Sequence, residues 1–128
     1  MLSLPPSVRI FLSRDPVDMR KGFDSLAHLV REHLGGDPLS GHLFVFRSRR
    51  GDRLKILYWD EGGLCQWYKR LEIGSFACPT LGTPAGERGL EIRAADLTLL
   101  LEGIDPSRVQ RPERYRPPAE PARLREIP

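Results

Sequence analysis

Apolar positions along the first 36 residues change from the period of a strand to that of a helix. Residues 8–12 place apolar side chains at every second position, which predicts a short strand. Asp15 is a favourable N-cap and Pro16 suits the first helical position, so we expect a helix to begin there. The glycine pair 35–36 should end it. Its apolar stripe recurs at steps of three and four and comprises Met19, Phe23, Leu26, Ala27, Val30 and Leu34.

Two segments rich in aromatic and branched residues follow, at 42–47 and 53–59. The polar residues 48–52 between them include a glycine, and this pattern predicts a β-hairpin. Side chains alternate along a strand, so each strand should have an apolar side to lay on the helix. These sides are formed by Phe44 and Phe46 on the first strand and by Leu54, Ile56 and Tyr58 on the second.

Residues 64–71 fit two kinds of secondary structure. Leu64, Trp67, Tyr68 and Leu71 have helical spacing, whereas tryptophan, tyrosine and cysteine favour a strand. We expect a strand, because the segment is short and follows the turn signal at 60–63. The result would be a meander of three antiparallel strands.

The C-terminal part predicts a short piece at 75–78, a Pro/Gly-rich loop to Gly89, a strand at 90–93 and a leucine-rich helix at 94–102. Residues 105–128 hold six of the twelve prolines and should form a flexible Pro/Arg-rich tail. The expected fold is therefore α+β. It is a single small domain over residues 1–104, in which an antiparallel β-meander packs against an N-terminal helix and a short C-terminal helix.

The formal net charge of +3 points only weakly to an acidic partner. Arginine supplies every cation except Lys21, Lys55 and Lys69, which fits phosphate recognition and equally fits the codon usage of a GC-rich genome. Cys65 and Cys78 lack metal-ligand spacing and should be small buried residues. Apolar runs are too short for a membrane span and no secretion signal is apparent, so we expect a cytoplasmic protein.

The predicted hairpin holds the densest cluster of positive charge. Arg47, Arg49, Arg50, Arg53 and Lys55 are opposed only by Asp52. A polyanion would offset the repulsion among them, and a two-stranded ribbon fits the major groove of DNA. An edge hairpin protected from aggregation by positive charge explains the same cluster equally well.

Lys69 and Arg70 extend this basic character into the third strand, next to Trp67 and Tyr68. Together with Trp59 these aromatic side chains could stack on bases. Burial of both tryptophans in the core is the favoured alternative.

Catalysis has little support in the sequence. Asp60 and Glu61 are adjacent, and neighbours on a strand point to opposite faces. The three histidines offer no pair at i and i+4, and no phosphate-binding glycine loop or nucleophile elbow is present. We expect no enzyme activity, no metal site and no cofactor.

Five segments, in this order and at this spacing, resemble the TnpB proteins, also called Orf2, of the insertion-sequence 66 family of bacterial transposable elements. They are residues 15–24 (DPVDMRKGFD), 40–47 (SGHLFVFR), 50–60 (RGDRLKILYWD), 67–72 (WYKRLE) and 100–105 (LLEGID). The resemblance covers about residues 4–105. The chain departs from the family at Cys78, where an aromatic residue is common before the proline, and in the loop 81–89.

The resemblance implies a small accessory protein, encoded beside a separate, larger transposase and needed for efficient movement of the element. It implies no catalytic residue. From the charge pattern we expect the hairpin to bind DNA at the element ends. An adaptor that binds the transposase without touching DNA is the competing hypothesis.

Overall fold

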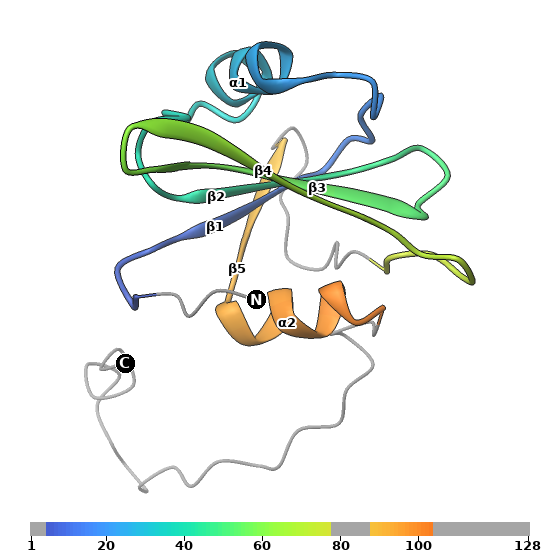
Figure 1. Cartoon of the computed structure of the whole chain (residues 1–128). Helices are drawn as coiled ribbons and strands as arrows, with labels where there is room; N and C mark the ends of the chain where they lie inside the picture. Colours follow the sequence, from blue (N-terminus) through green and yellow to red (C-terminus); the bar gives the residue numbers. More distant parts are fainter. Residues whose placement is uncertain (1–4, 78–87, 104–128) are drawn as a thin grey trace, which may run out of the picture.

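A mixed five-stranded sheet lies between two helices in the computed structural model, which describes residues 5–77 and 88–103 (Figure 1). Helix α1 covers one face of the sheet and helix α2 the other (Figure 1). The elements are β1 (Ile10–Ser13), α1 (Phe23–Glu32), β2 (Leu43–Arg47), β3 (Arg53–Asp60), β4 (Gly63–Arg70), β5 (Gly89–Ile92) and α2 (Ala94–Leu101). The predicted α+β class is confirmed.

The strands lie side by side in the order β4-β3-β2-β1-β5. The predicted meander is confirmed, because β2, β3 and β4 pair antiparallel. Strand β1 pairs parallel with β2, which requires a long crossover, and α1 lies in that crossover. Strand β5 pairs antiparallel with β1, so β4 and β5 form the two edges of the sheet.

The prediction that the first helix begins at Asp15 and Pro16 is wrong. Helix α1 begins at Phe23, after an N-cap at Gly22, and ends at Glu32. The backbone N–H of the buried Val17 instead donates to the carbonyl of Arg47 at 2.9 Å. This bond to the end of β2 holds the preceding segment in a non-helical path, and it outweighs the local capping preference.

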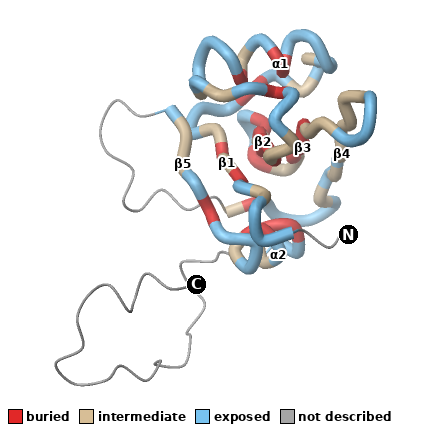
Figure 2. The backbone as a smooth tube through the Cα atoms, turned by 90° about the vertical axis from the view of Figure 1, so that its left-hand side faces the viewer, coloured by how far each residue is buried: buried red, intermediate tan, exposed pale blue. Residues whose placement is uncertain are grey.

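The two faces of the sheet carry separate apolar clusters. Phe44, Phe46 and Leu57 pack with α1, whereas Leu54 and Ile56 pack with α2. The expectation that both hairpin strands lay their apolar sides on the first helix is therefore wrong, because β3 turns its predicted apolar side to α2. Figure 2 shows the buried positions concentrated in the central strands and on the helix sides that face them.

Strands β3 and β4 meet in a tight two-residue turn. Asp60 pairs with Gly63, and the residues between them have positive φ angles, 35° at Glu61 and 92° at Gly62. Such a turn matches the twist of a hairpin. The predicted strand at 64–71 is confirmed, because β4 runs from Gly63 to Arg70.

The predicted strand at 90–93 and helix at 94–102 correspond to β5 and α2 within one residue at each end. Cys78, most of the loop to Gly89 and the predicted tail at 105–128 lie outside the described residues. Within residues 5–77 and 88–103, neither helix has the length and apolar character needed to cross a bilayer.

Candidate nucleic-acid interface

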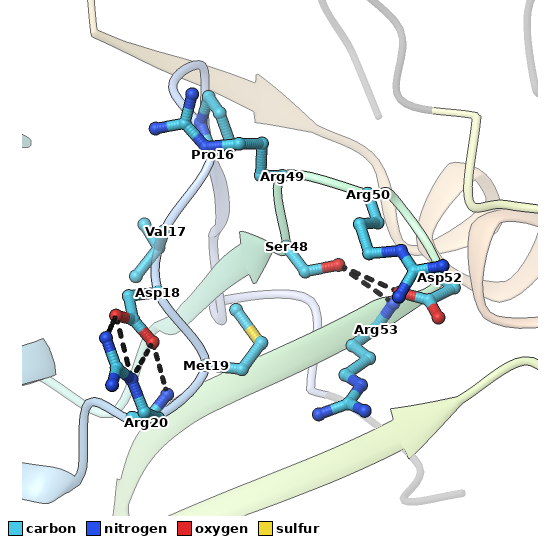
Figure 3. Close-up of a pocket in the computed structure, with 10 residues that line it drawn as sticks. All are labelled: Pro16, Val17, Asp18, Met19, Arg20, Ser48, Arg49, Arg50, Asp52 and Arg53. Carbon is cyan, nitrogen blue, oxygen red and sulfur yellow. Dashed lines mark hydrogen bonds and ion pairs between the residues drawn. The ribbon is translucent and has the colours of Figure 1, made fainter.

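The tip of the β2–β3 hairpin, residues 48–52, is organised around the side chain of Ser48. The backbone N–H groups of Gly51 and Arg53 donate to Ser48 Oγ at 3.2 and 3.1 Å, and this hydroxyl lies 3.3 Å from Asp52 Oδ1. Ser48 is only 7% exposed. Figure 3 shows Ser48 and Asp52 joined in this way, with Arg49 and Arg50 on the loop. The hydroxyl therefore fixes the loop that carries two arginines.

The tip is also fastened to the chain that follows β4. The N–H of Phe76 donates to the carbonyl of Gly51 at 2.6 Å, and the N–H of Leu71 donates to the carbonyl of Asp52 at 2.7 Å. Gly51 has φ +83°, and a Cβ there would lie 3.2 Å from the Cβ of Ser75. The contact at this point needs glycine, and it makes the tip a fixed part of the domain.

Three arginines project from this region, two from the tip and one from the start of β3 beside it. Arg49 and Arg50 are exposed and Arg53 is partly exposed. Within residues 5–77 and 88–103 none of the three pairs with a carboxylate, and the guanidinium of Arg53 has only the Tyr68 hydroxyl, at 3.4 Å. Their positive charge is thus available to an anion.

An open cavity of about 450 Å³ separates these arginines from the segment 16–20, which runs opposite the tip (Figure 3). Its two acidic residues are already engaged, Asp52 with Ser48 and Asp18 with Arg20. The Asp18–Arg20 pair is bidentate, with a shortest distance of 2.7 Å, and it lowers the pKa of Asp18 to about 2, mainly through the side-chain hydrogen bonds from Arg20. The segment 16–20 therefore adds no unpaired acid to the cavity.

Two of the five predicted hairpin cations face the protein itself. Lys55 is 6% exposed, and its Nζ donates to the carbonyls of Met19 and Lys21 at 2.7 and 3.0 Å and lies 4.7 Å from the centroid of the Tyr68 ring. Arg47 Nη1 donates to the carbonyl of Phe76 at 2.8 Å. Lys55 thus binds the segment that forms the opposite wall of the cavity, and Arg47 binds the segment that follows β4.

The remaining candidates separate onto opposite faces of the sheet. Lys69 faces α2 and donates to the carbonyl of Leu101 at 2.7 Å, where a cation complements the helix C-terminus. Arg70 is exposed on the other face and pairs with Glu72 at 2.9 Å, which lowers the pKa of Glu72. Of these two, only Arg70 lies on the same face as Arg53.

The aromatic candidates also separate. Trp67 is partly buried against the α2 cluster and Trp59 is half-buried, whereas Tyr68 is 47% exposed. The favoured alternative for the tryptophans, burial, is thus realised in part. Tyr68 alone among the three combines large exposure with neighbouring guanidinium groups.

Asp60 and Glu61 lie exposed on the β3–β4 turn. No three histidine, cysteine, aspartate or glutamate side chains gather as potential metal ligands in the described part of the chain. His42 Nδ1 accepts a hydrogen bond from the backbone N–H of Arg9 at 2.9 Å, and the ring of His33 contacts Arg88.

Sequence reasoning missed the segment 16–20 as the second wall of the cavity, because its residues were assigned to a helix. A usable signal was present. Asp18 followed two residues later by Arg20 can form a local turn, and the Asp18 carboxylate does accept the backbone N–H of Arg20 at 2.9 Å.

Fold and site together define a small domain that presents guanidinium groups on a fixed hairpin beside an open cavity. The chain belongs to the family described as IS66 Orf2 like protein, whose family model matches residues 8–111. The resemblance seen in the sequence is thereby confirmed. The family implies an accessory role associated with transposition, and it is not a known class of enzyme.

Two relatives come from Sinorhizobium fredii. The uncharacterized protein y4jC is 38% identical over 117 residues, which cover 91% of this chain and 97% of the relative. The uncharacterized protein y4hO is 43% identical over 105 residues, which cover 82% of this chain and 88% of the relative. No solved structure matches the chain.

Proposed function

We propose that this protein is a non-enzymatic accessory factor in the transposition of an insertion sequence, and that it binds the DNA of the element ends through Arg49, Arg50 and Arg53. The observation that carries the proposal is the placement of these arginines. One side of an open cavity is lined by Arg49 and Arg50 on the fixed loop and by Arg53 at the start of β3. None of the three is paired with a carboxylate in residues 5–77 and 88–103.

Phosphate is the anion that this arrangement suits. Guanidinium groups donate two parallel hydrogen bonds to phosphate oxygens, and such charge-assisted bonds are stronger than neutral ones. A loop already fixed by Ser48 and by the segment after β4 loses little freedom on binding. Release of counterions from DNA would add to the affinity.

The test compares two variants of equal net charge. The first replaces Arg49, Arg50 and Arg53 with alanine, and we expect its affinity for element-end duplex to fall by at least about tenfold, because the phosphate contacts are lost. The matched control replaces Arg9, Arg31 and Arg93 with alanine, and these residues are exposed elsewhere in the domain. Affinity would be measured by fluorescence anisotropy with both variants shown to be folded.

Equal loss in the two variants would mean that only net charge matters, and it would contradict the proposed site. Unchanged affinity in the first variant would exclude the hairpin tip as the DNA-binding surface. Magnesium- or manganese-dependent DNA cleavage by the pure wild-type protein would contradict the non-enzymatic role.

An adaptor for the element's transposase, without DNA contact, is the second candidate. Ile73 favours it, because this apolar side chain is 92% exposed in the segment that follows β4. A stable complex with the transposase that Ile73→Ser weakens, together with no retention of the isolated protein on DNA at low salt, would establish the adaptor in place of the DNA-binding factor.

A further inference from the structure

A second hollow adjoins the cavity of the hairpin tip. Arg53, Tyr68, Arg70 and Glu72 line an open space of about 550 Å³, and Arg53 also lines the cavity beside Arg49 and Arg50. The two spaces therefore share Arg53 as a lining residue. An anionic chain that contacts the tip could continue across β4.

The sheet register explains why these side chains gather. Arg53 pairs with Arg70 and Lys55 pairs with Tyr68 across β3 and β4, and paired side chains of antiparallel strands lie on the same face. Helix α1 packs on this face near Leu57 and Leu64, at the opposite end of the hairpin. Helix α1 does not cover the end that bears Tyr68, and this residue is 47% exposed.

The ring of Tyr68 is held in place by its neighbours. The Lys55 ammonium lies over one face of the ring, 4.7 Å from the centroid, and Lys55 is itself fixed by two backbone carbonyls. Arg53 Nη1 donates to the Tyr68 hydroxyl at 3.4 Å. A ring that is held by these two contacts and is 47% exposed offers a flat, oriented surface for stacking.

We propose that Tyr68 stacks on an unpaired base, and that this surface gives the protein a preference for duplex DNA that continues into a single strand. The inference rests on the proposed function, because the tip arginines would hold the adjacent duplex. Bases inside a duplex have both faces covered by their neighbours, so only an unpaired nucleotide can present a face to the ring. Arg53, which has no carboxylate partner within residues 5–77 and 88–103, flanks the ring and complements the phosphates of such a strand.

The experiment compares two DNA probes with the same duplex, one blunt and one carrying a six-nucleotide single-stranded extension. We expect the extended probe to bind about tenfold more tightly, the gain typical of one base stacked on an aromatic side chain. A fluorescent adenine analogue in the extension should be quenched on binding, which reports stacking directly.

Two variants separate the ring from its hydroxyl. Tyr68→Ala should remove both the preference and the quenching, while affinity for the blunt probe, which depends on the tip arginines, stays within about twofold. Tyr68→Phe keeps the ring and should keep the preference. A circular dichroism spectrum and an unfolding midpoint for each variant check that the domain is folded.

Equal affinity of wild-type protein for the two probes would overturn the stacking surface and leave the proposed function standing. Binding to neither probe would overturn both. An RNA extension bound more tightly than the DNA extension would overturn the assignment to DNA.

Discussion

Lys55 shows how far the chemistry of one residue depends on segments distant in the sequence. The charge pattern predicts Lys55 as one of five cations at the hairpin, and alternation along the strand places it on the same face as Arg53. The sequence could not show that residues 16–21 lie over this position and offer their carbonyls to the ammonium. The sequence therefore predicted the cluster of cations, but it could not predict which of their side chains reach solvent.

Replacing Lys55 with methionine keeps most of the apolar stem and removes the charge. We expect the free energy of unfolding to fall by about 2 kcal/mol, because two partly buried carbonyls lose a charged donor. Chemical denaturation measures this change. The matched variant Arg50→Met, at an exposed position on the same hairpin, should change stability by less than about 0.5 kcal/mol. Equal effects would contradict the structural role assigned to Lys55.

Among the elements, those defined by local pattern were predictable and those defined by tertiary contact were not. The strand alternation and the turn glycines predicted β2, β3 and β4, since pairing in a hairpin depends on neighbours in sequence. The start of α1 was not predictable, because the hydrogen bond from Val17 to Arg47 joins segments 30 positions apart. For the same reason the parallel pairing of β1 with β2 has no local signal.

The conformation of the hairpin tip depends on the glycine at position 51. Both Gly51 and Gly62 have positive φ, so alanine at either position should cost about 1–2 kcal/mol of stability. Only at Gly51 would the new methyl group meet another residue, at 3.2 Å from Ser75, whereas nothing lies within 4 Å at Gly62. We expect Gly51→Ala to cost about 1 kcal/mol more than Gly62→Ala, as measured by thermal or urea unfolding. The opposite order would contradict the close packing of the tip.

On the scale of the whole molecule, the arrangement of charge matters more than its sum. The net charge is only +3, and four arginines elsewhere in the described ranges, Arg9, Arg20, Arg70 and Arg93, are paired with acids. Arg49, Arg50 and Arg53 have no such partner there. Under the proposed function, these three guanidinium groups set the number of phosphates that would be neutralised at this surface.

This number gives a quantitative prediction for salt dependence. With three phosphates neutralised, the logarithm of the affinity for blunt duplex should fall with the logarithm of salt concentration at a slope of about −2.7. A titration between about 0.05 and 0.2 M salt measures it. Replacing the three arginines with alanine should bring the slope close to zero. A wild-type slope near zero would show that phosphate contacts do not drive binding.

The hydrogen bond from Phe76 to Gly51 links the loop that carries Arg49 and Arg50 to the interior, because the Phe76 side chain is fully buried in the α2 cluster. A substitution that disturbs this buried cluster would displace the loop without replacing any arginine. Transposition-defective alleles recovered at Phe76, or at Leu97 and Leu100 of the same cluster, would therefore mark the support of the loop rather than a second contact surface.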